Sequence, residues 1–178
     1  MAASKGASFR TLGVLAAIAV GIFAADQLSK LWVLDSLVPG DHHPVLGELL
    51  QLTLVRNPGA AFSLASGSTW VFSIIAATVV VVIIWFAGRI RSMAWASVFG
   101  LLLGGTLGNL FDRLFREPSF GQGHVIDFLE VWMFPAIFNV ADIAIVSSLC
   151  LFVLLTIRGV HLDGRRSASL PTAADPEA

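Results

Sequence analysis

Two aspartates in the C-terminal half of the chain have the chemistry needed for acid–base catalysis. Asp127 and Asp142 lie in the stretch 124–142, with Asn139 between them. The fifteen residues after Asp142 carry no charge, so this aspartate stands at the mouth of a candidate membrane span, where an acid usually has a role. Two carboxylates at one site tend to share a proton, because like charges a few ångströms apart do not both ionise easily. The pair therefore predicts a hydrolytic dyad.

Each of these residues also has an ordinary structural interpretation. Asn139 suits the N-cap of a helix, and Asp142 is then a first-turn acid favoured by the helix dipole. We expect the helix to enter lipid from about Ile137, which counts against capping. Asp127 equally fits an acid in a loop. The residue types alone leave both interpretations open.

Two further polar motifs precede this stretch. Asp26 and Lys30 lie four residues apart near the end of the first apolar run, so they share a helix face and form either a plain ion pair or a contact to substrate. Residues 56–62 contain Asn57 and Gly59 in an Asn-Pro-Gly turn, followed by small residues that permit close backbone approach. This motif is either a tight turn or part of a binding site.

A third motif closes the next apolar run. Asn109, Asp112 and Arg113 are either a helix end at the membrane interface or groups that hold a substrate backbone and orient an aspartate. His42 and His43 lie in a turn-rich loop without a third ligand at metal spacing, so we expect no metal site and no cofactor.

The composition determines which elements hold these groups. Apolar residues make up 56% of the chain, charged residues only 13%, and the mean hydropathy is +0.83. This is typical of a polytopic membrane protein. No basic stripe suggests nucleic-acid binding, and the single cysteine, Cys150, excludes an intramolecular disulfide.

The apolar runs predict an all-α membrane protein with one domain at 11–157 between two tails, 1–10 and 158–178. Alternating residues at 50–55 predict a strand, part of a small cradle at about 41–66 on the membrane surface. Residues 114–136 are expected to loop back. Gly100, Gly104 and Gly108 recur every four residues and predict a helix face that packs closely on a neighbour. The four predicted membrane spans are 11–34, 70–87, 93–111 and 137–157.

Basic residues predict the orientation, because they favour the cytoplasmic side. Seven of the eleven fall on the side of both termini, and four fall on the other side. We therefore expect both termini in the cytoplasm. All the polar motifs then converge on the outer face.

The motifs together resemble the lipoprotein signal peptidases, also called signal peptidase II. The likeness covers about 11–157. It is carried by five segments: Asp26-Gln27-Leu28-Ser29-Lys30, residues 56–62, residues 104–113, Gly123-His124-Val125-Ile126-Asp127-Phe128, and Phe138-Asn139-Val140-Ala141-Asp142. The segment between Asp127 and Phe138 is short for the family, and its tip at 132–134 is apolar.

The resemblance implies an aspartic endopeptidase of the bacterial inner membrane. Such an enzyme removes the signal peptide of a diacylglyceryl-modified prolipoprotein just before the lipidated cysteine, and globomycin blocks it. The family has four transmembrane helices, an extracytoplasmic β-cradle and a short extracytoplasmic helix. We expect a monomer whose partners are prolipoproteins, membrane lipid and globomycin-type inhibitors. The implied catalytic pair is Asp127 and Asp142, and the implied supporting residues are Asp26, Lys30, Asn57, Gly59, Asn109, Arg113 and Asn139.

A small proton-coupled transporter or channel is the alternative from another class, because acids within membranes also bind cations. It requires polar residues spread through the depth of the bilayer. Here the polar motifs gather at one surface instead, which favours the peptidase.

Overall fold

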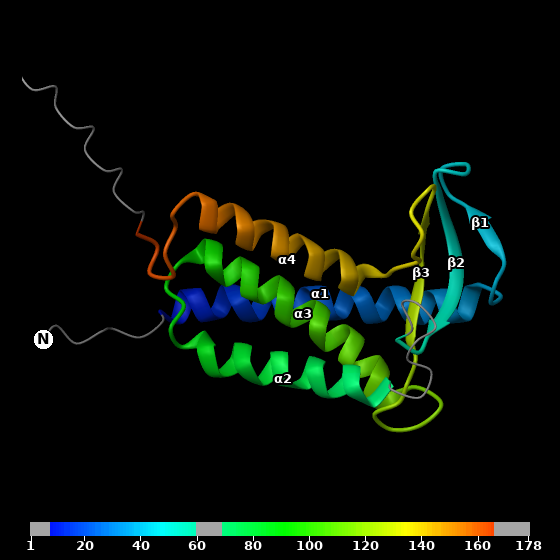
Figure 1. Ribbon diagram of the computed structural model, residues 1–178, viewed down its shortest axis with the longest axis horizontal. Coiled ribbons are helices and arrows are strands. Elements are labelled where there is room, and N and C mark those ends of the chain that lie inside the picture. The colour runs from blue at the N-terminus through cyan, green and yellow to red at the C-terminus, as the bar shows by residue number, and fades with distance from the viewer. Residues whose placement is uncertain (1–7, 60–68, 166–178) are drawn as a thin grey trace, which may run out of the picture.

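The structure, a computed structural model, describes residues 8–59 and 69–165 of the 178-residue chain (Figure 1). Four helices in these residues are long and apolar enough to cross a membrane, which confirms the four predicted spans. They are α1 (Phe9–Ser36), α2 (Thr69–Ala87), α3 (Met93–Phe115) and α4 (Val140–Ile157). The short extracytoplasmic helix implied by the resemblance is not among the helices of the described residues.

Helix α3 is the centre of the bundle and packs on each of the other three helices (Figure 1). The glycines of α3 explain how it packs so closely on its neighbours. A Cβ at Gly104 would lie 2.6 Å from the Ala19 carbonyl oxygen on α1, and a Cβ at Gly105 would lie 2.5 Å from the Ala141 carbonyl oxygen on α4. Lipid offers helices little hydrophobic reason to associate, so close backbone approach supplies the packing. The predicted glycine face is therefore used, and Gly105 extends it to a second helix.

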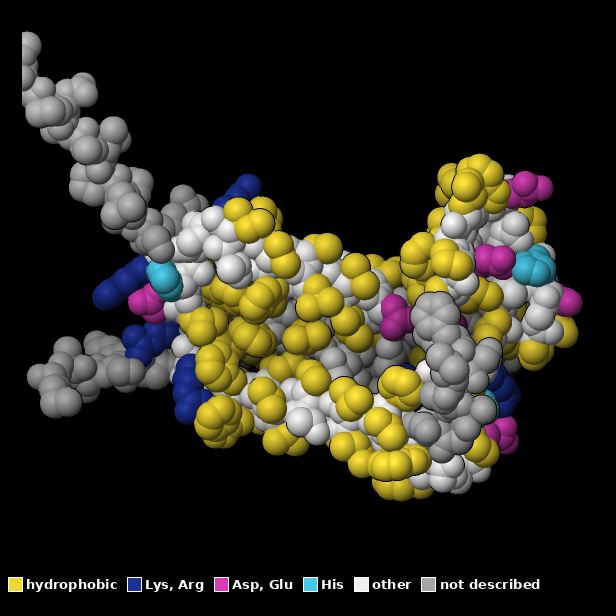
Figure 2. All heavy atoms as spheres, viewed as in Figure 1, with side chains coloured by type: hydrophobic (Ala, Val, Ile, Leu, Met, Phe, Trp, Pro, Cys, Tyr) yellow, Lys and Arg dark blue, Asp and Glu magenta, His cyan; other side chains and the backbone are white. Residues whose placement is uncertain are grey.

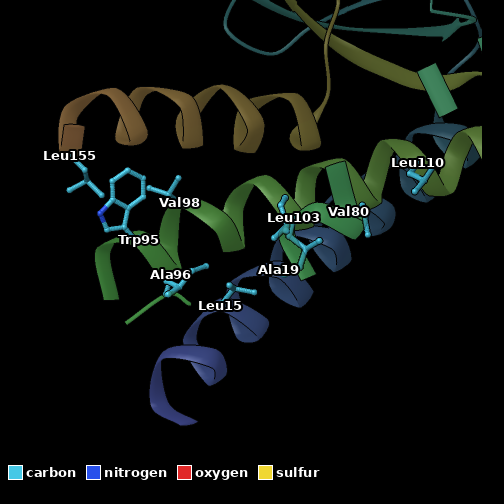
Figure 3. Packing of buried hydrophobic residues seen from close by; sticks show 11 residues of the cluster. Leu15, Ala19, Val80, Trp95, Ala96, Val98, Leu103, Leu110 and Leu155 are labelled. Atoms are coloured by element: carbon cyan, nitrogen blue, oxygen red, sulfur yellow. The ribbon is translucent and has the colours of Figure 1, made fainter. Parts of the chain in front are cut away.

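The apolar core lies between the helices rather than around them. Figure 3 shows Leu15 and Ala19 of α1 facing Ala96 and Leu103 of α3. Hydrophobic side chains also cover the outside of the bundle, while Lys and Arg gather at the end away from the sheet (Figure 2). An apolar exterior and an apolar core together are what a bilayer requires of a helix bundle.

A three-stranded antiparallel sheet crosses one end of the bundle. Its order is β1 (His42–Pro44), β2 (Leu50–Asn57), β3 (Val125–Val131). Strand β2 confirms the predicted alternating segment, whereas β3 falls in the segment expected to be a loop. The first four residues of β3 are all buried, so this strand lacks the alternation of apolar and polar residues that marks a half-buried strand. A second apolar cluster joins the sheet to Val33 of α1.

Three element ends differ from the prediction. Helix α3 continues to Phe115, so Asp112 and Arg113 lie within it. Helix α4 begins at Val140 rather than at about Ile137. Residues 158–165, assigned to the tail from sequence, fold back on the bundle, where the Trp95 indole donates to the Val160 carbonyl at 2.9 Å.

Candidate active site

Strands β2 and β3 bring the first aspartate beside an asparagine. Asp127 pairs with Val55 in the antiparallel register, and Asn57 lies two residues further along the same face. The Asn57 amide donates to Asp127 Oδ2 at 2.8 Å. Asp127 is only 3% exposed, so the interpretation as a loop acid is wrong.

The second aspartate lies in the first turn of α4 and forms a capping box. Asn139 is the N-cap: its side chain accepts from the Asp142 backbone N–H at 3.0 Å, and Asp142 Oδ2 accepts from the Asn139 N–H at 3.1 Å. Our expectation that the helix begins at about Ile137 is therefore wrong, and the capping interpretation is correct for the backbone. The other carboxylate oxygen, Oδ1, is left for a different partner.

One asparagine joins the two aspartates. The fully buried Asn139 side chain caps Asp142 with its oxygen and donates from Nδ2 to Asp127 Oδ1 at 2.6 Å. Asp127 and Asp142 therefore lie on either side of a single amide, at the end of the bundle that carries the sheet. The same residue caps α4 and links the two carboxylates, so the two interpretations of the sequence do not exclude each other.

A second asparagine, from α3, completes the link. Asn109 donates to Asp142 Oδ1 at 2.8 Å, and its own oxygen accepts from Asn139 at 3.1 Å and from Lys30 at 3.1 Å. Each amide has its donor and acceptor ends used consistently, which fixes their orientation. The pair of aspartates is thus held from three directions, by β2, α3 and the start of α4.

A fully buried group of charges lies next to Asn109. Lys30 contacts Asp26 at 2.8 Å and Asp112 at 2.7 Å, and all three side chains are 0% exposed. Arg116 contacts Asp112 at 2.6 Å and balances the second negative charge. Buried charges persist only when they are paired and hydrogen-bonded. Asp26 and Lys30 therefore form a buried ion pair, as one of the two interpretations of their spacing expected.

The buried charges also tie the elements together. Asp26 accepts from the Ala141 N–H of α4 at 2.9 Å, and Asp112 accepts from the Ile126 N–H of β3 at 3.3 Å. Gln27, which donates to Asp26 at 3.0 Å, and Arg116 were not singled out from the sequence. Gln27 also donates to the Gly108 carbonyl at 3.1 Å and to Asp112 at 3.3 Å, both on α3, so the packing of α1 on α3 reveals its role. For Arg116, the spacing of four residues from Asp112 was the available signal in the sequence.

Burial changes the acidity of Asp127. Its pKa is raised to about 6: desolvation by burial is the main cause and the nearby Asp142 charge adds to it, while the hydrogen bonds from Asn57 and Asn139 and the charge of Lys30 act in the opposite direction. A carboxyl with such a pKa holds a proton at mildly acidic pH. This is the property needed of the protonated member of an acid–base pair.

Arg113 lies on α3 one turn from Asn109. Its Nη1 donates to the Asn109 carbonyl at 3.3 Å, and its guanidinium lies 5.8 Å from the centre of the Phe72 ring of α2. The buried Nε has no hydrogen-bond partner among the described residues. A buried donor left unpaired is costly, and such a donor beside a dyad is a natural partner for a substrate carbonyl.

Gly59 begins the approach to α2. Its φ of +99° belongs to the region that favours glycine, and its N–H donates to Asn57 Oδ1 at 2.8 Å. A Cβ here would lie 2.7 Å from the Phe72 ring. Positions 60–62 of this motif lie outside the described residues. All nine site residues named from the sequence belong to one connected region.

In the described part of the chain, no group of three or more His, Cys, Asp or Glu side chains is arranged to hold a metal ion. The groups gathered at the site are two linked carboxylates, three amides and one guanidinium. Such a set can activate a water and polarise a carbonyl.

Comparisons with known proteins agree with this geometry. The family model described as signal peptidase (SPase) II matches residues 18–158. A lipoprotein signal peptidase of Leifsonia xyli subsp. xyli is 59% identical over 160 residues, covering 90% of this chain and 74% of that protein. The protein of the same name from Mycobacterium avium is 46% identical over 159 residues, covering 88% of this chain and 87% of its own length.

A solved structure supports the same assignment. A bacterial membrane enzyme determined by the in meso method at 1.9 Å resolution superposes with a TM-score of 0.75 at 27% identity, covering 87% of this chain and 98% of that one. The transporter alternative receives no support from these comparisons. The chain is a multi-pass membrane peptidase and belongs to the signal peptidase II family.

Proposed function

We propose that this chain removes the signal peptide from prolipoproteins, cutting immediately before the lipid-modified cysteine. The observation that supports this most is the single amide of Asn139, which donates to Asp127 and caps Asp142. Relatives that are 59% and 46% identical to this chain are named lipoprotein signal peptidases, which points to the substrate class. The catalytic type is aspartic.

In the proposed mechanism, Asp127 and Asp142 share one proton. We assign that proton to Asp127, because burial raises its pKa to about 6. Its O–H donates to the scissile carbonyl, while the ionised Asp142 takes a proton from the attacking water. The tetrahedral intermediate then collapses, the C–N bond breaks, and the leaving amine takes the proton that Asp142 received.

The supporting residues divide by what they touch. Asn109 and Asn139 keep the carboxylates in place, and Asn57 orients Asp127. The unpaired Nε of Arg113 is the donor for a substrate carbonyl. Gly59 lets the chain after Asn57 pass directly against the Phe72 ring, where a Cβ would lie only 2.7 Å away.

The proposal also includes the location and orientation of the chain in the membrane. We place the chain in the bacterial inner membrane with both termini cytoplasmic, since seven of the eleven Lys and Arg residues are assigned to that side. The dyad then lies at the outer face, where the diacylglyceryl chains of a substrate sit among the helices. The working unit is a monomer, with no cofactor.

The test is incubation of the full chain in lipid nanodiscs with a diacylglyceryl-modified prolipoprotein, followed by mass spectrometry of the products. The expected product begins at the lipidated cysteine, and globomycin suppresses its formation. The matched control is the same precursor without the lipid, which should be cut far more slowly. Cleavage at another bond, or no cleavage of the lipidated precursor, contradicts the proposed function.

A further inference from the structure

Large apolar side chains cluster at the end of the sheet opposite Asp127. This end, the sheet tip, contains the turn before β2 and the turn after β3. The two turns are joined by the Trp132 N–H, which donates to the Leu49 carbonyl at 3.1 Å. Met133 is 81% exposed, and its neighbours in the tip are more than half exposed. The exposed apolar residues of the sheet tip are Val45, Leu46, Leu49, Trp132, Met133 and Phe134.

The sheet tip projects to the side of the bundle. Figure 1 shows β2 and β3 running across the helix axes and extending past α4. Figure 2 shows a hydrophobic cluster at that projecting end, separated from α4 by a hollow. No described part of the chain covers these side chains. In water, an apolar patch of this kind would be a site of association.

Helix α1 indicates whether the sheet tip lies at the height of the membrane. Helix α1 continues past the buried charges, and Val33 packs there on Leu54 of the sheet. The residues just before Val33 on α1 are Leu31 and Trp32, whose side chains are 57% and 55% exposed. Apolar, outward-facing surface of a membrane span therefore reaches the level of the sheet. Trp side chains favour the boundary between headgroups and acyl chains.

We propose that the sheet tip inserts into the bilayer interface on the side of the membrane that carries the sheet. Its occupant is lipid, because the tip combines one Trp, one Phe and aliphatic side chains, the composition that partitions into this boundary. The turn before β2 also carries the exposed Glu48, and the other polar groups lie along the sheet: Thr53 and His42 both contact the Glu130 carboxylate, at 2.6 and 2.8 Å.

Insertion would hold the sheet at both ends. One end of β3 is fixed by the hydrogen bonds of Asp127, and the other end is fixed by lipid. The depth of the dyad relative to the bilayer is then set by the sheet as well as by the helices. On the proposed function, a lipid-borne substrate reaches the dyad through the hollow between the sheet tip and α4.

The test measures depth without using activity, so its failure is distinct from a failure of the proposed function. In a Cys150→Ala background, Met133→Cys and Leu46→Cys are each labelled with a nitroxide and studied in lipid nanodiscs by electron paramagnetic resonance. The control is Asp41→Cys, in the exposed turn between α1 and β1. Collisions with oxygen report lipid, and collisions with a water-soluble nickel complex report water.

We expect the ratio of oxygen to nickel accessibility to be several-fold higher at 133 and 46 than at 41. Lipids carrying a relaxation agent on the headgroup should broaden the signals at 133 and 46 but not at 41. Two tip positions are used so that a poorly folded variant, detected by thermal unfolding, leaves the other to decide. Nickel accessibility at both tip positions equal to that at 41 would overturn the proposal, and would favour a protein partner for the tip.

Discussion

At the scale of single residues, the chemistry depends on how two carboxylates differ while lying next to the same amide. Asp127 comes from a buried strand and is surrounded by amide donors, whereas Asp142 belongs to the first turn of α4, where its own backbone N–H is capped. Both contact Asn139, so neither can move without disturbing the other. This unequal setting is what separates the roles of two identical side chains.

The raised pKa of Asp127 predicts a pH dependence. Because the folded protein holds this proton up to about pH 6, the shared proton is present below that pH and is lost as pH rises through it. We expect kcat/KM for a lipidated prolipoprotein to decline on the alkaline side of about pH 6. The measurement is a pH–rate profile of the nanodisc-embedded enzyme, which reports the free enzyme. A profile that rises through this range would contradict the assignment of the proton to Asp127.

Replacing Asn57 tests whether the decline of kcat/KM at alkaline pH, the alkaline limb of the profile, reflects the proton on Asp127. The Asn57 amide stabilises the ionised Asp127 and so lowers its pKa. The Asn57→Ala variant should therefore shift the alkaline limb to higher pH, by roughly one unit for each 1.4 kcal/mol of lost hydrogen-bond energy. Glu130→Gln on the same strand is the matched control and should leave the limb in place. A limb that stays fixed or moves to lower pH in Asn57→Ala would remove Asn57 from this role.

At the scale of elements, helix α3 positions the site because glycines let it touch two helices at once. Gly104 approaches α1 and Gly105 approaches α4, each at backbone contact distance. The same helix carries Asn109 and Arg113, so the close packing on α4 sets the reach of Asn109 to Asp142. The sheet fixes the other half of the site through the register of β2 and β3.

A methyl group at Gly105 should disturb this packing. Its Cβ would lie 2.5 Å from the Ala141 carbonyl oxygen, so α3 and α4 must separate. We expect Gly105→Ala to lower the free energy of unfolding by about 1–3 kcal/mol, the usual effect of overpacking. Gly13→Ala is the control, since nothing lies within 4 Å of a Cβ there. Thermal unfolding in detergent micelles measures both, and equal midpoints would show that the contact is not tight.

The sequence predicted these elements unevenly, for physical reasons. Long apolar runs define spans well, and the glycine spacing identified the packing face. Strand β3 was missed because Val125 to Phe128 are buried on both faces and show no alternation. The start of α4 was placed early because apolar residues before Asn139 extend the apolar run without belonging to the helix. Apolar character alone does not locate a cap.

The site was more predictable than its surroundings. Asp127, Asp142 and their amides stand in motifs whose residue types already suggest their chemistry. Gln27 was missed because its partners Gly108 and Asp112 lie on another helix, whereas the pairing of Arg116 with Asp112 follows their spacing of four residues. A sequence shows which polar groups need partners, and the fold determines which partners they find.

At the scale of the whole molecule, a buried charge network joins the bundle to the sheet. Lys30 on α1 is the centre, Asp26 reaches the backbone of α4, and Asp112 reaches the backbone of β3. Asn109 and Asn139 hydrogen-bond to the two aspartates. Asn109 also accepts a hydrogen bond from Lys30 at 3.1 Å, which connects these amides to the charge network. The dyad is therefore supported by the same residue that holds the elements together.

Removing the charge of Lys30 should lower the stability of the whole protein. Lys30→Met leaves Asp26 and Asp112 buried without this cation, and breaking a buried pair usually lowers the free energy of unfolding by about 3–5 kcal/mol. Arg89→Met is the matched control. Arg89 stacks at 4.2 Å from the Trp85 ring centre, and losing that contact should change the free energy by less than about 1 kcal/mol. Thermal unfolding of both variants in micelles measures the difference, and similar midpoints would show that the network is dispensable.

One comparison decides whether Asp127 and Asp142 form a hydrolytic pair: the cleavage rate of a lipidated prolipoprotein by Asp127→Asn, by Asp142→Asn and by the Glu130→Gln control. Each Asn variant keeps the size of the side chain and should unfold near the wild-type temperature. We expect both to lose activity by at least about 100-fold, the low end for general acid–base catalysis, while Glu130→Gln keeps the wild-type rate. Near-wild-type cleavage by either folded Asn variant would contradict the shared proton and return that aspartate to a purely structural role.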